Sequence, residues 1–78
     1  MFELFVLDSC PYSIKVMNFM KENNIKYNKR VVSEPENYDL LQKLGGKSQV
    51  PFLYDEEKGL KMYESDDIIE YLKNEMQE

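Results

Sequence analysis

The alternation of hydrophobic and polar positions in the first half of the chain predicts a strand, a helix and a second strand. Residues 2–7 are apolar except at Glu3, which is typical of a buried strand. Residues 14–20 place apolar side chains at helical spacing, and the two asparagines at 23–24 end that helix. Residues 25–32 alternate at first, as a second strand does. Two strands joined by a helix form a βαβ unit, so we expect them to be parallel with a right-handed crossover.

A second, shorter helix is predicted after the polar connector at residues 33–37. Residues 38–44 carry its apolar face, and the pair of glycines at 45–46 ends it. Either Ser33 or Asn37 is placed to cap its start, because both side chains can accept a hydrogen bond from a free helical N–H.

The rest of the pattern predicts a hairpin and a last helix. Pro51 leads into a strand that ends at Tyr54, residues 55–59 form the turn, and residues 60–63 return. Ser65 is a natural N-cap for the final helix. The order β-α-β-α-β-β-α predicts an α/β domain with a four-stranded mixed sheet flanked by three helices on its two faces.

Length and charge restrict the class of protein. A chain of 78 residues holds one domain, which we expect to span residues 1–78. The 15 acidic and 10 basic residues give a net charge of −5, which argues against nucleic acid or an anionic membrane as partner. There is no basic leader, and no apolar run approaches the ~20 residues of a membrane span. We therefore expect a cytoplasmic monomer, with residues 73–78 as its charged terminus.

The counts of cysteine and histidine narrow the chemistry. A single cysteine cannot form an internal disulfide, so a reducing compartment is expected. Histidine is absent, which excludes Cys-His and Ser-His catalysis and removes the ligands of a protein-only zinc site. Several tyrosines are interpreted as scattered core or surface aromatics. They are Tyr27, Tyr38, Tyr54, Tyr63 and Tyr71.

Cys10 is the candidate nucleophile, because it lies between the first predicted strand and the first predicted helix. Pro11 suits the first helical position, where its missing N–H costs nothing. The N–H groups of Tyr12 and Ser13 then point at the sulfur, and the positive end of the helix lowers the thiol pKa. The alternative is a small, inert buried residue, which a lone cysteine usually is. The Cys-Pro-Tyr-Ser context at a helix start favours the nucleophile.

Three motifs in this order resemble those of a glutaredoxin, a member of the thioredoxin fold. They are Cys-Pro-Tyr-Ser at residues 10–13, Val-Pro at 50–51 and Glu-Ser-Asp-Asp at 64–67, and the resemblance covers essentially the whole chain. It implies a thioredoxin fold, glutathione as co-substrate, and Cys10 as the thiolate that attacks glutathione mixed disulfides.

The resemblance also implies a role for each residue around the thiol. Val50 would pair its backbone with the cysteinyl part of glutathione, as an added strand does, and Pro51 would be a cis-proline beside the sulfur. The start of the last helix would hold the γ-glutamyl end. Lys15 or Lys47 would reach the glycine carboxylate. The implied catalytic residues are Cys10 and Ser13, and those implied for glutathione binding are Pro11, Tyr12, Gln49, Val50, Pro51, Glu64, Ser65 and Asp66.

The chain departs from the common glutaredoxin pattern at its motif. Dithiol glutaredoxins carry Cys-Pro-Tyr-Cys, so Ser13 stands where the resolving cysteine would be, either naturally or as an engineered replacement. Leu7 stands where many have a lysine, and Cys10 could stand for a selenocysteine. Residues 49–51 and 63–65 look more like the glutathione-transferase-like branch. Members of that branch normally continue into an all-helical domain, which these 78 residues do not include.

Three functions fit these residues. The first is a glutathione-dependent thiol–disulfide oxidoreductase that deglutathionylates proteins or small thiols through Cys10 alone, with a second glutathione resolving the adduct. The second is a carrier of a [2Fe–2S] cluster ligated by Cys10 and glutathione from each of two subunits, against which the stiff, bulky Pro11-Tyr12 pair counts. The third is the glutathione-binding N-terminal half of a transferase-like protein without redox turnover.

Overall fold

The computed structural model describes residues 1–76, and its elements follow the order predicted from the sequence. Residues 77 and 78, the end of the predicted charged terminus, lie outside the described residues. The strands are β1 (Phe2–Val6), β2 (Tyr27–Val31), β3 (Phe52–Asp55) and β4 (Leu60–Tyr63). The helices are α1 (Pro11–Glu22), α2 (Pro35–Gly45) and α3 (Ser65–Met76).

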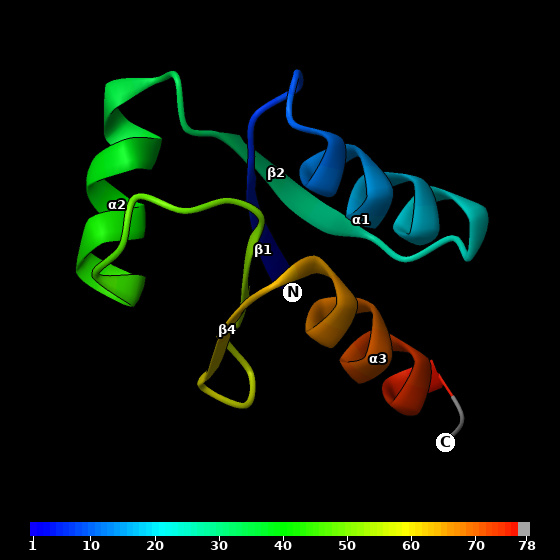
Figure 1. Ribbon diagram of the computed structural model, residues 1–78. Helices are drawn as coiled ribbons and strands as arrows, with labels where there is room; N and C mark the ends of the chain where they lie inside the picture. The colour runs from blue at the N-terminus through cyan, green and yellow to red at the C-terminus, as the bar shows by residue number, and fades with distance from the viewer. Residues whose placement is uncertain (77–78) are drawn as a thin grey trace.

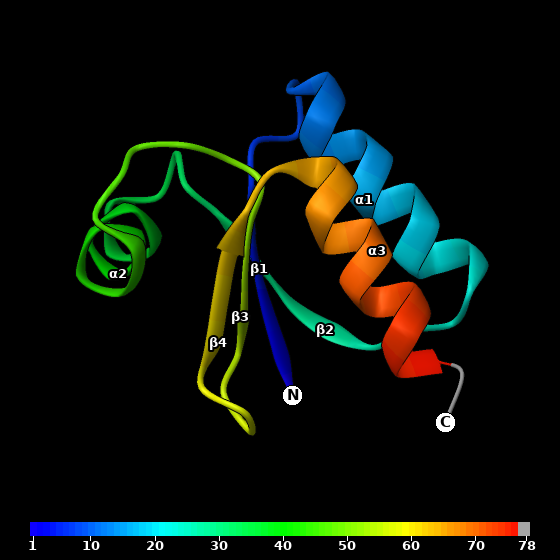
Figure 2. The same cartoon turned by 60° about the horizontal axis from the view of Figure 1, so that its bottom comes forward.

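The four strands form one mixed sheet in the order β2-β1-β3-β4. β1 runs parallel to β2 and antiparallel to β3, and β3 pairs antiparallel with β4. Figure 1 shows the chain in this arrangement, and Figure 2 shows α2 on one face of the sheet with α1 and α3 on the other. The predicted four-stranded mixed sheet with three helices is confirmed.

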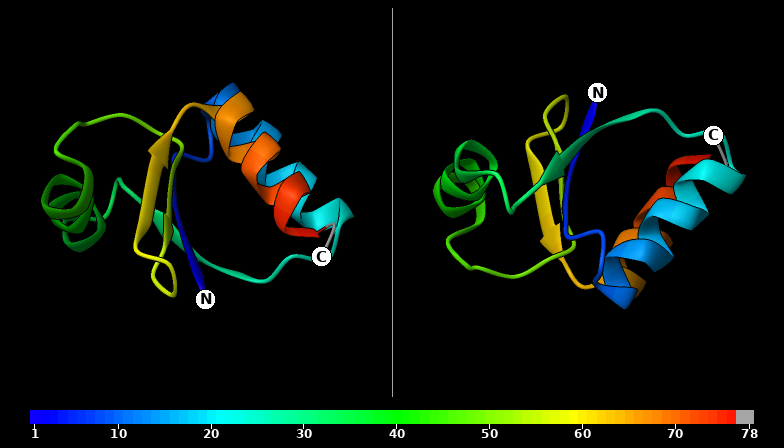
Figure 3. Two further views of the ribbon diagram at one scale, coloured as in Figure 1. Left: turned by 90° about the horizontal axis from the view of Figure 1, so that it is seen from below. Right: turned by 90° about the horizontal axis from the view of Figure 1, so that it is seen from above.

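Two hydrophobic clusters, one on each face of the sheet, hold the three layers together. Alternate residues of β1 point to opposite faces, so Leu4 joins the cluster under α1 and α3, and Phe5 joins the cluster under α2. Figure 3 shows α1 and α3 side by side over their face of the sheet. Their packing fixes the starts of both helices near one another. The first cluster consists of Leu4, Val6, Val16, Met20, Leu53, Ile68 and Leu72, and the second of Phe5, Leu41 and Phe52.

The second strand begins later than its sequence pattern predicts. The pattern starts at residue 25, whereas β2 starts at Tyr27. The reason is that the chain is still turning out of α1, since Asn24 has a φ of 55° and the Ile25 N–H donates to the Met20 carbonyl at 2.9 Å. Ile25 therefore packs against the core without joining the sheet.

The predicted cap of α2 is wrong. Neither Ser33 nor Asn37 occupies the N-cap, which is Glu34 with an extended backbone. Asn37 lies inside the first turn, and its Nδ2 donates to the Val31 carbonyl at 3.0 Å. Its side chain therefore ties α2 back to the end of β2. The predicted end of the helix is confirmed, because Gly46 is the C-cap with a φ of 81°.

None of the helices within residues 1–76 is long and apolar enough to cross a bilayer.

Candidate active site

Cys10 lies between β1 and α1, as the sequence predicts. β1 ends at Val6, and a tight turn follows in which the Cys10 N–H donates to the Leu7 carbonyl at 3.0 Å. Cys10 is the N-cap of α1, and its carbonyl accepts the Ile14 N–H at 3.0 Å. Pro11 takes the first helical position. The next N–H groups along the chain have no carbonyl partner inside the helix, so they are available to the sulfur.

The pKa of the Cys10 thiol lies below its ordinary value. The largest cause is the hydrogen bond from the backbone N–H of Ser13, while partial burial of the sulfur opposes the shift. The hydroxyl of Ser13 and the backbone N–H of Tyr12 lower the pKa further. All the favourable contacts come from the first turn of α1, so the helix that follows the cysteine stabilises its thiolate.

Ser13 is held in place by a second contact. Its side chain is fully buried, and its Oγ accepts the Leu7 N–H at 3.3 Å. One lone pair of the hydroxyl is thereby occupied, and its proton remains available for the sulfur of Cys10. A hydroxyl in this place donates to the thiolate but cannot attack a disulfide as a second cysteine would.

The loop before β3 contributes the cis-proline that the family resemblance implies. The Val50–Pro51 peptide bond is cis, and Pro51 is buried. Gln49 precedes this pair in the same loop, and its Nε2 donates to Glu64 Oε1 at 3.2 Å. The hydrogen bond joins the loop to the segment between β4 and α3.

The start of α3 differs by one residue from the sequence prediction. Ser65 is already the first helical residue, and the Ile68 N–H donates to the Glu64 carbonyl at 3.0 Å, so Glu64 occupies the N-cap position. Glu64 has a φ of 74°, a left-handed conformation that costs a residue with a side chain about 1–2 kcal/mol. Nothing in the local sequence indicates this backbone, because glutamate does not favour it. The first N–H groups of α3 are left without intrahelical partners.

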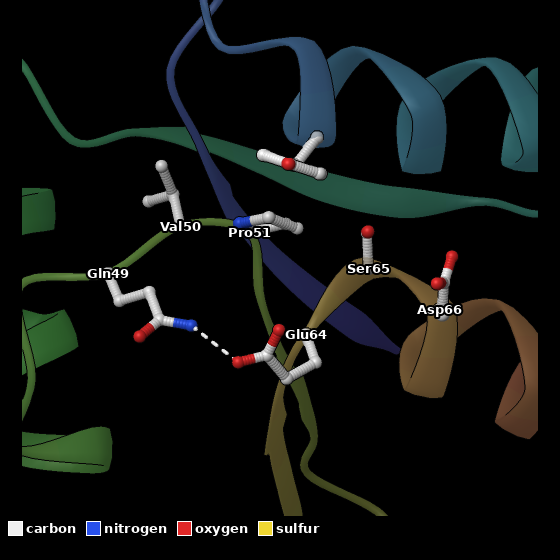
Figure 4. Close-up of a pocket in the computed structure, with 7 residues that line it drawn as sticks. Gln49, Val50, Pro51, Glu64, Ser65 and Asp66 are labelled. Atoms are coloured by element: carbon white, nitrogen blue, oxygen red, sulfur yellow. Dashed lines mark hydrogen bonds between the residues drawn. The ribbon is translucent and has the colours of Figure 1, made fainter.

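A cleft of about 380 Å³ lies between these elements, within the roughly 300–1,000 Å³ typical of small-molecule sites. Figure 4 shows Gln49 and Val50 on one side of it and Glu64, Ser65 and Asp66 on the other, with the Gln49–Glu64 hydrogen bond between them. Three of the predicted site residues, Cys10, Pro11 and Ser13, are not among its lining residues, and the first turn of α1 reaches the cleft through Tyr12. The lining residues are Tyr12, Gln49, Val50, Pro51, Glu64, Ser65 and Asp66.

The two candidate lysines have partners of their own. Lys15 forms an ion pair with Asp66, which places its ammonium beside the start of α3. Lys47 holds its ammonium over the ring of Tyr63, 5.3 Å from the ring centroid. Both pairs are accessible to solvent, so each contributes at most about 1 kcal/mol to stability.

Tyr63 has a role that the sequence pattern does not indicate. From the sequence it is one of several scattered aromatics, but its hydroxyl lies against the backbone of Lys47. The two residues are 16 positions apart and come from different elements, so no local signal predicts the contact.

The architecture and the site define the class of protein. A βαβ unit followed by an antiparallel hairpin and a helix, with the cysteine at the start of α1 and a cis-proline before β3, is the thioredoxin fold. Within that fold, the profile of the glutathione S-transferase N-terminal domain matches residues 4–78. The chain belongs to this family.

Solved structures with the same fold include both transferases and smaller proteins. The apo form of a mutant human glutathione S-transferase T1-1 matches with a TM-score of 0.83 and 24% identity over 99% of this chain and 33% of that one. Glutaredoxin 2 of Salmonella typhimurium, in complex with glutathione, matches with a TM-score of 0.76 and 24% identity over 95% of this chain and 33% of its own. A mutant thioredoxin-like protein matches with a TM-score of 0.79 and 21% identity over 95% of this chain and 96% of its own.

This chain therefore spans about a third of the length of the first two proteins and nearly all of the third. A search of curated proteins gave no match.

Proposed function

We propose that this chain is a glutathione-dependent thiol–disulfide oxidoreductase of the glutaredoxin type, which removes glutathione from mixed disulfides through Cys10. The observation that carries the proposal is the position of Cys10 at the N-cap of α1, directly before Tyr12 of the cleft, where the first turn of the helix lowers the pKa of the thiol. A thiolate attacks disulfides and a thiol does not, so the contacts from Ser13 and Tyr12 prepare the residue for this reaction.

In the first half-reaction, the Cys10 thiolate attacks the glutathionyl sulfur of a mixed disulfide. A bond forms between Cys10 Sγ and the glutathionyl sulfur, the original S–S bond breaks, and the substrate leaves as a thiolate that takes a proton from water. The substrate thiol is reduced and Cys10 is oxidised to its mixed disulfide with glutathione. The substrates we propose are glutathionylated proteins and small thiols.

In the second half-reaction, a second glutathione thiolate attacks the glutathionyl sulfur bound to Cys10. Oxidised glutathione leaves, and Cys10 returns to the thiolate that the first turn of α1 stabilises. The Ser13 hydroxyl donates a hydrogen bond to the Cys10 sulfur, but it cannot attack the adduct as a second cysteine would. The cycle is therefore a monothiol one. The adduct on Cys10 is therefore expected to persist until free glutathione reaches it.

The cleft supplies the contacts that such a tripeptide requires. In the proposal, the backbone of Val50 pairs with the cysteinyl part, and the free N–H groups at the start of α3, together with the Ser65 hydroxyl, donate hydrogen bonds to the γ-glutamyl carboxylate. Asp66 lies beside Ser65 on this side of the cleft, and Gln49 reaches Glu64 from the other side. The glutathione complex of the structurally similar glutaredoxin 2 supports this choice of ligand.

A second candidate is the glutathione-binding N-terminal domain of a transferase-type protein. The match to the N-terminal domain family of the glutathione S-transferases favours it. Glutathione binding is common to both candidates. They differ in whether Cys10 forms a covalent adduct during turnover.

Intact-mass spectrometry after incubation with oxidised glutathione tests the proposal. We expect one glutathione on the wild-type chain, none on Cys10→Ala, and complete reversal by reduced glutathione. If Cys10 stays unmodified at neutral pH while the folded chain still binds glutathione, the oxidoreductase is refuted and the transferase-type domain remains.

We further propose that residues 1–78 form one domain that works as a cytoplasmic monomer.

A further inference from the structure

The loop between α2 and β3 lines the cleft, so its order in the free protein affects how tightly the cleft binds a peptide. This loop, residues 46–51, supplies Gln49, Val50 and Pro51 to the cleft, whereas the nucleophile lies at the start of α1 and the other side of the cleft at the start of α3. Loops without restraint are mobile, and ordering one on binding weakens affinity. The contacts that restrain the loop therefore bear on function.

Tyr63, the last residue of β4, makes two of these contacts with a single hydroxyl. The hydroxyl oxygen accepts a hydrogen bond from the Lys47 N–H at 3.1 Å, and the hydroxyl donates one to the Lys47 carbonyl at 3.0 Å. One side chain thus satisfies both polar groups of a loop residue, as a partner strand would. The ring itself is fixed against Phe52, with 4.6 Å between the ring centroids.

Gly45 shows how closely Tyr63 approaches the loop. A Cβ atom at Gly45 would lie 2.1 Å from the Tyr63 hydroxyl oxygen and 2.8 Å from Tyr63 Cζ, both far inside contact distance. Gly45 is the last residue of α2, so a helix former would otherwise suit it. The close approach of the tyrosine gives a physical reason for a glycine here that is independent of the helix end, which Gly46 provides.

A second anchor ties the same loop to α2. The Ser48 hydroxyl lies 2.7 Å from the Tyr38 hydroxyl, and it also accepts a hydrogen bond from Gln42 Nε2 at 2.7 Å. Because this anchor remains when Tyr63 is changed, loss of the Tyr63 contacts loosens the loop without releasing it.

We infer that Tyr63 is a positioning residue for the glutathione site, acting through the backbone of Lys47 on Val50 and Gln49. The inference rests on the proposed function for its ligand. Tyr63 is not among the residues that line the cleft, and its contacts do not reach the first turn of α1 that sets the reactivity of Cys10. Its contribution is therefore expected in glutathione recognition and not in thiolate formation.

The test compares Tyr63→Phe with Tyr71→Phe, which also removes one tyrosine hydroxyl. Tyr71 bonds the buried Asp55 at the other end of the hairpin, away from the cleft. Two quantities are measured for each variant: the KM for glutathione in reduction of a small glutathione mixed disulfide, and the rate at which iodoacetamide alkylates Cys10. For Tyr63→Phe we expect KM to rise about three- to tenfold, since the loop must be ordered on binding, with an unchanged alkylation rate.

Tyr71→Phe is expected to keep the wild-type KM although it lowers stability, because its lost hydrogen bond lies outside the loop. Amide hydrogen exchange at residues 47–50 should accelerate in Tyr63→Phe alone. If the wild-type chain turns over and Tyr63→Phe keeps its KM, or if both variants raise KM equally, the positioning role is refuted and the proposed function stands. If the wild-type chain neither turns over nor binds glutathione, the proposed function fails and the role of Tyr63 fails with it.

Discussion

Replacement of Ser13 by alanine separates the hydroxyl from the other groups that stabilise the Cys10 thiolate. The backbone N–H of Ser13, which is the largest cause of the lowered pKa, stays in the variant, and so does the N–H of Tyr12. Only the side-chain donor is lost. Because a donor to the charged form is removed, the pKa of Cys10 is expected to rise toward its ordinary value while staying below it.

The free energies lost in Ser13→Ala follow from the two hydrogen bonds of the hydroxyl. A hydrogen bond to a charged group contributes about 1.5–3 kcal/mol when it is well shielded from water. The sulfur of Cys10 is only partly buried, so water replaces some of the lost bond, and the loss is expected at the lower end of that range. The Leu7 N–H also loses its acceptor, which at 3.3 Å is a long bond, and the cost to the folded state is about 1 kcal/mol.

The assay is the rate of Cys10 alkylation by iodoacetamide as a function of pH, with thermal unfolding on the same samples. Ser9→Ala is the matched control, because Ser9 flanks Cys10 on the other side and is exposed. We expect Ser13→Ala to be alkylated roughly three- to fivefold more slowly below the thiol pKa, because the smaller thiolate fraction is partly offset by the greater nucleophilicity of a more basic thiolate. Its Tm should fall by about 4–8 °C, and Ser9→Ala should show no change. A folded Ser13→Ala whose pH profile superimposes on the wild type would refute a role for the hydroxyl.

Three further predictions concern stability and the loop. In urea titrations, the free energy of unfolding of the wild type relative to Cys10→Ala should increase from acidic to alkaline buffer. The reason is that the lowered pKa of Cys10 stabilises the folded state above the unfolded thiol pKa of about 8.5, and this stabilisation is lost as the pH falls through the folded pKa. Tyr71→Phe should lose about 1–3 kcal/mol in the same titration, because the buried Asp55 carboxylate loses a donor at 2.7 Å. Gly45→Ala should raise the KM for glutathione at least as much as Tyr63→Phe does, since the new Cβ displaces the tyrosine, and an unchanged KM would contradict the close approach.

The sequence predicts the fold well because each element carries its own signal. The buried pattern of β1, the helical spacing of α1 and the glycines after α2 depend on neighbouring residues, and the structure has all three. The errors lie at the ends of elements. The start of β2 depends on the left-handed backbone of Asn24, and the cap of α2 on a side-chain bond from Asn37 to β2, neither of which has a periodic pattern.

The site divides in the same way between local and distant contacts. The nucleophile is predictable because its activation comes from residues within three positions of Cys10 along the chain. The left-handed backbone of Glu64 and the contact of Tyr63 with Lys47 are not predictable from local pattern, because both depend on how the last strand and helix meet the loop before β3. A sequence motif therefore indicates the chemistry of the turn at Cys10, but it does not indicate the distant contacts that hold the rest of the site.

The thiol and the cleft beside it are positioned by different elements. Thiolate formation depends on the first turn of α1, whereas in the proposed function recognition of the tripeptide depends on the loop before β3 and on the start of α3, which are set by β4 and α2. The two parts meet at Tyr12, whose backbone N–H lowers the pKa of Cys10 and which also lines the cleft. A substitution elsewhere in one part need not disturb the other. Under the proposed function, we expect that Ser13 can be exchanged for a second thiol without altering the glutathione contacts, and that those contacts can change without loss of the Cys10 thiolate.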